Sequence, residues 1–358
     1  MPVKAMLIVF VVFVLTACQV PTQGLPDSTA ASSATPPGNL EETPVPIEPS
    51  PTIQEPTETQ PSISTDPLSP SPTATIVVTE APTSTPDVPQ PSGGLTQAII
   101  IDHVVLETFP QIPDGYIIKA SETSMLFRHA SIGWNMDMGL NCLMNKEQPR
   151  PRGCDKGVPG SEIVFDSKYD RSNWVFEFHQ PPPAQNPGWY AKVELFIDRI
   201  DNLAPNETYD TAAFKLGYVD ALGGSNIADV FFTSEDSTYP TIGDLEALEA
   251  RHPEITFIFW TIGLARQSYP ESEAFNQQLR EYVRANNRIL MDIADIESHR
   301  PDGTSCFSNL ENGVEAICDN YTDEPNAGHL NAYGRLRMAK AFWVLMAYVA
   351  GWDGEPAN

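Results

Sequence analysis

One stretch of the chain cannot build a folded core. Residues 19–95 contain seventeen of the 34 prolines and nine acidic side chains, but no aromatic residue and no Lys or Arg. A segment with so little apolar surface to bury stays disordered and favours extended polyproline conformations. We therefore expect a spacer that would reach roughly 240 Å when fully extended. Recruitment of a proline-binding module is the functional alternative.

An apolar run precedes this spacer. Lys4 is the only charged side chain before Cys18, and the apolar residues 6–15 are too few to span a bilayer stably. This is the layout of a cleaved export signal. Its last residues, Leu-Thr-Ala-Cys at 15–18, resemble a bacterial lipobox, which implies lipidation of Cys18. An ordinary secretory signal is the alternative. We expect a protein that works outside the cytoplasm, tethered to the membrane by its lipid.

The rest of the chain has the composition of a globular domain. Residues 96–358 hold every aromatic residue except Phe10 and Phe13, and they are numerous enough to bury one large core. We predict one domain here, after a signal peptide at 1–18 and a linker at 19–95. The formal net charge of the chain is -26. Such an acidic balance argues against nucleic acid or anionic lipid as a partner of the domain.

Strand and helix patterns alternate along this domain. A β-branched run opens 98–106, and further strands are predicted at 124–129, 212–219, 255–261 and 289–293. Helices are predicted at 116–122, 133–144, 190–203, 242–250, 272–286 and 330–352. This alternation favours an α/β fold with a parallel sheet covered by helices on both faces. In such sheets, reactive groups gather beyond the carboxyl ends of the strands.

Four cysteines remain after Cys18, in two local pairs. Cys142 and Cys154 are twelve positions apart, and so are Cys306 and Cys318. In an exported protein this pattern favours two short-loop disulfides, although two other connectivities stay open. Neither pair has the tight Cys-x-x-Cys spacing of a structural zinc site, so we predict no metal.

The first candidate for chemistry is Ser131, where a predicted strand stops and a helix begins. It lies in the sequence His-Ala-Ser-Ile-Gly at 129–133. Backbone N–H groups in the first turn of the helix could stabilise an oxyanion forming beside its hydroxyl. A serine nucleophile also needs a base within hydrogen-bond reach, held by a third group. The alternative is that Ser131 only caps the helix.

The second candidate is His329, near the other end of the domain. Turn-forming residues at 323–328 place it just before the terminal helix. An imidazole that titrates near neutrality suits a general base. A lone loop histidine is more often merely solvated. Its pairing with Ser131 across an α/β domain predicts that the two side chains lie within about 4 Å of each other.

Together these segments resemble the SGNH (GDSL-like) hydrolases, most closely a bacterial lipoprotein branch whose first block is His-x-Ser-x-Gly. The likeness covers most of 99–352. It includes Ile-Pro-Asp at 112–114, Asn-Pro-Gly at 186–188, Lys-x-x-Tyr-x-Asp at 215–220 and Asn-Ala-Gly-His-Leu-Asn at 326–331. The resemblance implies a flavodoxin-like three-layer α/β/α sandwich. It also implies ester hydrolysis or deacylation through an acyl-serine, without a metal or other cofactor.

Carried over residue by residue, the resemblance makes Ser131 the nucleophile and His329 the base. In the family an Asp stands three residues before this histidine, whereas here Asn326 occupies that place. An Asn can fix the imidazole tautomer but cannot balance an imidazolium charge. Asp323, six residues upstream of His329, is the other candidate for the orienting group.

The resemblance also assigns the groups that would bind the oxyanion or the substrate. Gly188, close to Asn186, corresponds to the glycine donor of the second block. The third block of the family offers an Asn, but residues 217–220 are Gly-Tyr-Val-Asp, so we expect Asn135 or Tyr218 to replace it. His129 shares a strand face with Ser131 and is expected to line the site or orient a substrate. A buried histidine bonded to the backbone is the alternative.

The expected function is that of a surface-tethered serine esterase or deacylase. Acylated glycans are the candidate substrates, because a long stalk would expose the domain to an envelope or an external polymer. The altered orienting position and the missing third-block Asn motivate an alternative, a non-catalytic lipoprotein that binds carbohydrate or peptide on the same fold. A two-lobed solute receptor fits poorly, because one domain is rather small for it.

Overall fold

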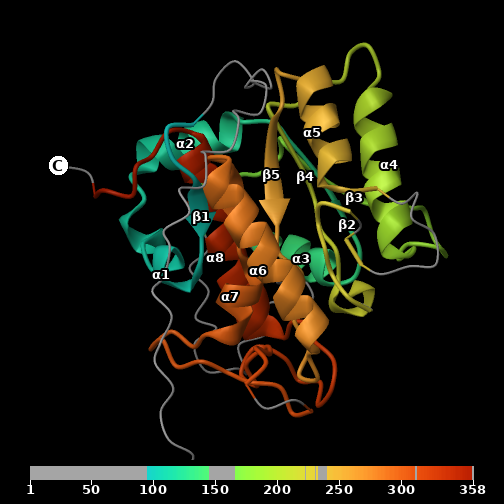
Figure 1. Cartoon of the computed structure of the whole chain (residues 1–358). Coiled ribbons are helices and arrows are strands. Elements are labelled where there is room, and N and C mark those ends of the chain that lie inside the picture. Colours follow the sequence, from blue (N-terminus) through green and yellow to red (C-terminus); the bar gives the residue numbers. More distant parts are fainter. Residues whose placement is uncertain are drawn as a thin grey trace, which may run out of the picture. The chain divides into compact units, whose positions relative to one another are not determined.

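The structure is a computed structural model that describes residues 95–144, 166–221, 223–229, 231–232, 240–310 and 313–356. The predicted signal peptide and almost all of the predicted linker lie outside these residues. Within them, a six-stranded parallel sheet is flanked by helices on both faces (Figure 1). The predicted α/β fold is therefore confirmed. Among the described helices, we find none with the length and apolar character needed to cross a membrane.

The sheet has the strand order β1-β6-β5-β4-β2-β3, and every pairing is parallel. The strands are β1 (Ile99–Ile101), β2 (Met125–His129), β3 (Trp174–Phe178), β4 (Thr211–Phe214), β5 (Thr256–Trp260) and β6 (Ile289–Met291). Leaving β1 aside, the order from β3 to β6 is that of a flavodoxin-like sheet. β1 extends this sheet at the edge beside β6. The strand order reverses at β2 and β4, which marks the expected position of a ligand site.

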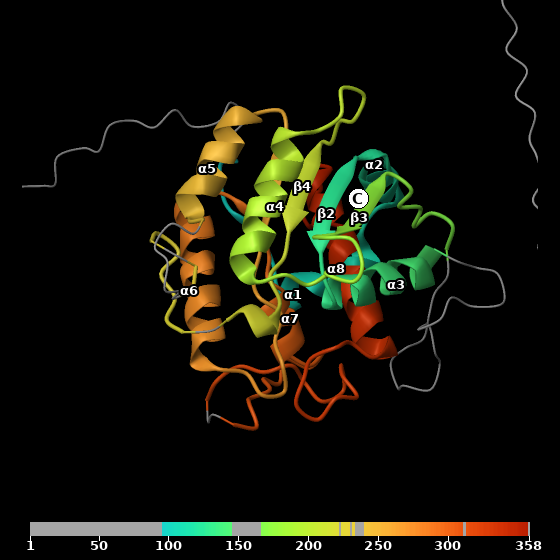
Figure 2. The same cartoon turned by 90° about the vertical axis from the view of Figure 1, so that its right-hand side faces the viewer.

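Two helical layers enclose the sheet (Figures 1 and 2). One layer contains α4 (Trp189–Asp201), α5 (Ile242–Arg251) and α6 (Pro270–Ala285). The other layer contains α2 (Asp114–Glu122), α3 (Ile132–Met144) and α8 (Ala332–Val349). The remaining elements are the short helices α1 (His103–Leu106) and α7 (Ile293–Ser298) and the 3₁₀ turns η1 (Phe109–Gln111) and η2 (Tyr218–Asp220). Alternate strand residues face opposite layers. Leu126 of β2 packs with the α4–α6 layer, and Phe127 packs with α8.

The structure differs from the sequence-based expectation in several places. β3 is missing from the predicted strands, because it is a five-residue edge strand whose signal is short. The predicted strand at 212–219 ends at Phe214. The chain turns into η2 there, and the Asp220 carboxylate accepts a hydrogen bond from the Gly217 N–H at 2.6 Å. The β-branched run at 98–106 forms a strand only to Ile101, since the Asp102 side chain caps α1.

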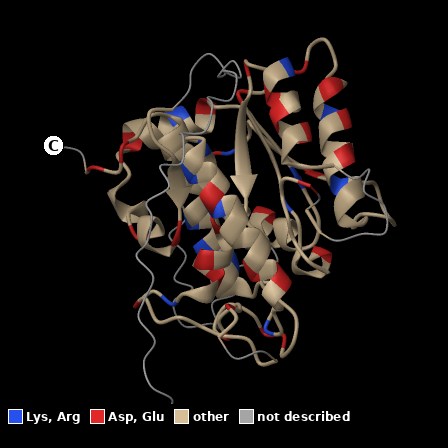
Figure 3. Ribbon diagram, in the orientation of Figure 1, with Lys and Arg blue, Asp and Glu red and all other residues tan. Residues whose placement is uncertain are grey.

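The outer helices carry mixed charge. Acidic side chains outnumber basic ones on α4, α5 and α6, and the two kinds are interleaved (Figure 3). A protein that binds a nucleic acid backbone needs a continuous basic surface. The α4–α6 layer offers none.

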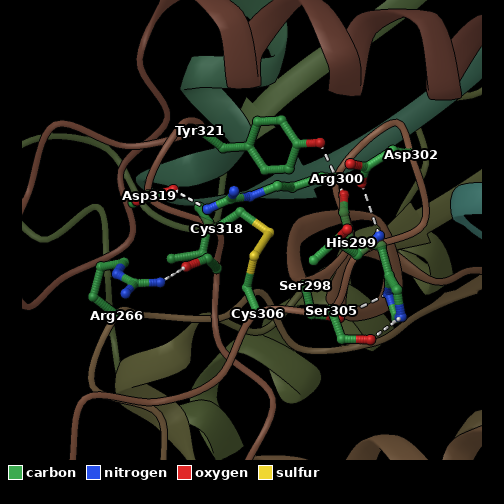
Figure 4. The surroundings of a disulfide bond; sticks show 12 residues. Arg266, Ser298, His299, Arg300, Asp302, Ser305, Cys306, Cys318, Asp319 and Tyr321 are labelled. Carbon is green, nitrogen blue, oxygen red and sulfur yellow. Dashed lines mark hydrogen bonds and ion pairs between the residues drawn. A yellow bond between two sulfur atoms is a disulfide. The ribbon is translucent and has the colours of Figure 1, made fainter.

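A disulfide fastens the segment that follows α7. Cys306 and Cys318 are bonded, as predicted (Figure 4). Their backbone N–H groups donate to the carbonyls of Ser298 at 2.7 Å and Glu297 at 2.9 Å. These two hydrogen bonds hold the disulfide-bonded segment against the end of α7, eleven residues or more before His329. The other predicted pair, Cys142 with Cys154, involves a residue outside the described ranges.

The contact between α3 and α8 predicts the effect of two matched glycine substitutions. A Cβ on Gly139 of α3 would lie 2.2 Å from the carbonyl oxygen of Arg335 in α8, whereas a Cβ on Gly115 of α2 would meet nothing within 4 Å. We expect Gly139→Ala to lower the free energy of unfolding by about 1–3 kcal/mol, because the helices must separate. Gly115→Ala should raise it by about 0.4–1 kcal/mol. Urea denaturation followed by circular dichroism measures both, and equal effects would contradict the close packing.

Candidate active site

Ser131 lies at the tight turn between β2 and α3, at the carboxyl end of the sheet. Its φ of 47° is left-handed, a conformation that residues other than glycine rarely adopt. Gly133 makes this turn possible, because a Cβ there would lie only 2.3 Å from the Cβ of His129. The His-x-Ser-x-Gly spacing thus reflects a steric requirement. It holds the serine at the apex of a strained turn, as is typical of functional sites.

The turn brings Ser131 to His329. Ser131 Oγ lies 2.5 Å from His329 Nε2, well within the expected separation. On the other side of the ring, His329 Nδ1 lies 2.8 and 3.1 Å from the two carboxylate oxygens of Glu324. Glu324 also accepts the backbone N–H of His329 at 2.8 Å. Hydroxyl, imidazole and carboxylate form one chain of hydrogen bonds, the arrangement that activates a serine.

Glu324 takes the place that the sequence pattern gave to Asn326 or Asp323. The Asn326 amide oxygen accepts a hydrogen bond from Gln267 Nε2 at 3.0 Å, and Asp323 accepts one from Asn331 Nδ2 at 3.1 Å. The structure therefore corrects both assignments. The loop before α8 folds back on itself, so that the residue five positions before the histidine reaches its ring. Family spacing alone could not reveal this turn.

The loop that carries His329 is held from two sides. A Cβ on Gly328 would lie 2.0 Å from the Leu264 carbonyl oxygen, so the loop rests directly on the segment after β5. On the α3 side, the buried Asn135 accepts the backbone N–H of Leu330 at 2.9 Å through its side-chain oxygen. Asn135 was expected to be an oxyanion donor. It instead positions the residue next to His329.

His129 is buried beneath the turn. It is 2% exposed and packs against Phe127, Phe176 and Phe178. Burial, together with the charges of Lys215 and Arg128, lowers the pKa of His129 to about 3. The ring is therefore neutral at physiological pH. Its expected role in the substrate site is not supported. The burial agrees with the alternative of a buried histidine, although His129 Nδ1 has no hydrogen-bond partner among the described residues.

A pocket of about 220 Å³ opens beside Ser131 and His329. Two predicted binding residues, Asn186 and Tyr218, line it, and the Tyr218 ring meets the His329 ring edge to face at 6.1 Å. Gly188 is the N-cap of α4 and is not among the lining residues. The other residues that line the pocket are Ala130, Ile132, Lys192, Lys215, Gly217 and Val219. Sequence reasoning gave no role to the two lysines.

The pocket also has donors for a developing negative charge. No described residue accepts a hydrogen bond from the backbone N–H of Ser131 or of Ile132. Both groups lie at the N-terminal end of α3, where the helix dipole favours an anion. The Asn186 side chain adds an amide to the same pocket. A carbonyl attacked by Ser131 would therefore form its oxyanion among preorganised donors.

One cluster of potential metal ligands lies elsewhere, formed by His103, Asp295 and His299. The two imidazole rings stack at 3.9 Å with an angle of 8° between their planes. Ring lone pairs lie in the ring plane, so two parallel stacked rings cannot direct their nitrogens at one ion. His299 Nδ1 also lies 2.8 Å from the Asp295 carbonyl oxygen, the geometry of an N–H donor. This cluster is held by hydrogen bonds.

Comparisons with known proteins add little to this geometry. No family model matches the sequence, and none of the curated proteins does. Among solved structures, the chain is similar to a protein from Bacteroides fragilis that is proposed to be an acylhydrolase, with 10% sequence identity and a TM-score of 0.29. The similarity covers 60% of this chain and 88% of that one. A likeness this distant carries no argument, so the function must be inferred from the site.

The site predicts different effects for Glu324 and Asn326. Glu324→Gln keeps the size of the side chain but removes the charge that would balance an imidazolium. We expect it to slow the labelling of Ser131 by a fluorophosphonate at least ~100-fold. Asn326→Ala removes a side chain bonded to Gln267 and should change the rate less than about threefold. Time-resolved labelling measures both rates. Equal losses in the two variants would contradict the assignment of Glu324 as the residue that orients His329.

Proposed function

We propose that this protein is a serine hydrolase of the SGNH type that cleaves esters through an acyl-serine intermediate. The observation that carries the proposal is the chain from Ser131 Oγ to His329 Nε2 at 2.5 Å, and from His329 Nδ1 to Glu324 at 2.8 Å. The chain borders a pocket large enough for a small acyl group. The His329 side chain is 43% exposed, so substrate and water can reach it.

The mechanism follows from these positions. Ser131 Oγ attacks the ester carbonyl carbon while its proton passes to His329 Nε2, and Glu324 stabilises the imidazolium. The N–H groups of Ser131 and Ile132 stabilise the oxyanion of the tetrahedral intermediate. As this intermediate collapses, His329 gives its proton to the departing alcohol and leaves an acyl-serine. A water molecule, deprotonated by His329, then releases the acid and regenerates the hydroxyl.

The hydrogen-bonded carboxylate weakens the case for a protein that only binds. That alternative rested on the Asn at position 326 and on the missing third-block Asn. Glu324 removes the first reason, because it supplies a charged orienting group. Residues 217–220 contain no Asn, but the side chain of Asn186 lines the pocket and offers an amide instead. We retain acylated glycans as the proposed substrates, because exposed aromatic rings near the site could stack on sugar rings. Trp134 and Tyr190 are such residues, each one helical turn or less from a residue of the site.

Removal of the hydroxyl tests the proposed reaction. Ser131→Ala should lower kcat for p-nitrophenyl acetate at least ~1000-fold, and His329→Ala should do nearly the same, since residues that act as one unit are not additive. Release of nitrophenolate measures the rate, and near-ultraviolet circular dichroism shows whether each variant is folded. Equal rates for the wild type and a folded Ser131→Ala variant would remove the assignment.

We also propose that the protein is tethered outside the cytoplasm through a lipid on Cys18. The support is the apolar run that ends in Leu-Thr-Ala-Cys, followed by a proline-rich spacer. Cys18→Ser should move the mature protein from the membrane fraction to the soluble fraction, because two or more acyl chains are needed for stable anchoring. Fractionation of expressing bacteria followed by immunoblotting measures this shift. Retention of the variant in the membrane fraction would contradict the anchor.

A further inference from the structure

The two lysines of the catalytic pocket differ in one respect. Lys192 and Lys215 are 1% and 2% exposed, and both line the pocket beside Ser131. Lys192 Nζ forms an ion pair with the buried Asp220 at 2.5 Å. No described carboxylate lies within 4 Å of Lys215 Nζ, which donates only to the Leu216 carbonyl at 3.1 Å. One buried cation is thus neutralised by a partner and the other is not.

Lys215 has hydrogen-bond donors that lack partners among the described residues. An ammonium group has three N–H donors, and its burial is costly when they lack partners. The described residues satisfy one of the three. The remaining donors belong to a side chain that borders an open pocket, so an anionic oxygen of a bound molecule can supply the missing partners. A charge-assisted hydrogen bond of this kind is among the stronger ones in proteins.

Several charged groups surround Lys215. Burial lowers the pKa of Lys215, with Lys192 adding to the effect and Glu297 and Asp220 opposing it. Burial also raises the pKa of Glu297 of α7, whose carboxyl group accepts the Leu264 N–H at 2.6 Å and lies beyond ion-pair distance of Lys215 Nζ. The carboxylate of Asp220 is already bound by Lys192.

We propose that the ester cleaved at Ser131 carries a carboxylate at the far end of its acyl group, and that Lys215 binds this carboxylate. The inference rests on the proposed hydrolase function and specifies its substrate class. The preferred substrates are hemiesters of short dicarboxylic acids. A pocket of about 220 Å³ accommodates an acyl group of this size.

The exposure of the site residues indicates which part of the ester enters the pocket. His329 must protonate the leaving alcohol, and its side chain is 43% exposed. The alcohol therefore departs toward solvent. The acyl group stays bonded to Ser131 Oγ and occupies the enclosed part of the pocket, where Lys192 and Lys215 are almost fully buried.

A pair of esters of nearly equal shape tests this inference. The p-nitrophenyl esters of succinate and of 4-methylpentanoate have acyl groups of similar size, but only the first ends in a carboxylate. We expect kcat/KM of the full-length protein at pH 7 to be about 10- to 100-fold higher for the hemisuccinate. Lys215→Met should lower this ratio to about one or less. The control Lys168→Met removes a surface lysine paired with Asp114 and should leave the ratio unchanged.

Calorimetric titration with succinate provides a measurement that does not depend on turnover. We expect wild-type protein to bind succinate, and Lys215→Met, where it folds, to bind at least ~10-fold more weakly.

If neither ester is hydrolysed, the proposed function fails, and the titration alone decides about Lys215. If both esters are hydrolysed equally well by the wild type, the function stands and the inference is overturned. A preference for 4-acetoxybenzoate over both esters would place the charge on the alcohol and also overturn it.

Discussion

The candidate site depends on one steric contact, between the side chain of His129 and the backbone of Gly133. Position 133 is a glycine, so β2 can turn into α3 within three residues and hold Ser131 in a left-handed conformation. Any side chain at position 133 would clash with His129 in this turn. A wider turn would carry the hydroxyl away from the sheet edge and from His329. The buried, neutral His129 is therefore part of the support for the site, although it is not among the residues that line the pocket.

Much of the fold could be predicted from the sequence, because its signals are local. The strand patterns at β2, β5 and β6 and the helical periods of α3, α4, α5, α6 and α8 follow from runs of apolar residues, whereas the six-residue α7 was not predicted. β3 could not be predicted in the same way, because an edge strand of five residues gives too short a pattern. The pairing of Ser131 with His329 could also be predicted from the sequence, since both lie where strands or loops lead into helices.

The groups that surround these two residues were harder to predict from the sequence, because their positions depend on how a loop folds. Glu324, Asp323 and Asn326 all lie within six positions of His329, and only the path of the chain decides which reaches the ring. The same applies to the charge of the pocket. A chain with a net charge of -26 gives no hint of a buried cationic site. Lys192 does leave a trace in the sequence, as a lysine within the buried stripe of α4 that includes Trp189, Val193 and Phe196.

The close approach of α3 and α8 at Gly139 has a consequence for the motion of the site. Ser131 immediately precedes α3, and His329 lies three residues before α8. Two helices whose backbones touch cannot slide or tilt independently without a clash. Thermal displacements of Ser131 and His329 should therefore be correlated, so that the distance between them fluctuates less than the position of either side chain. Other residues that line the pocket lie on α4 and η2, which belong to neither of these two helices, so this contact does not constrain them directly.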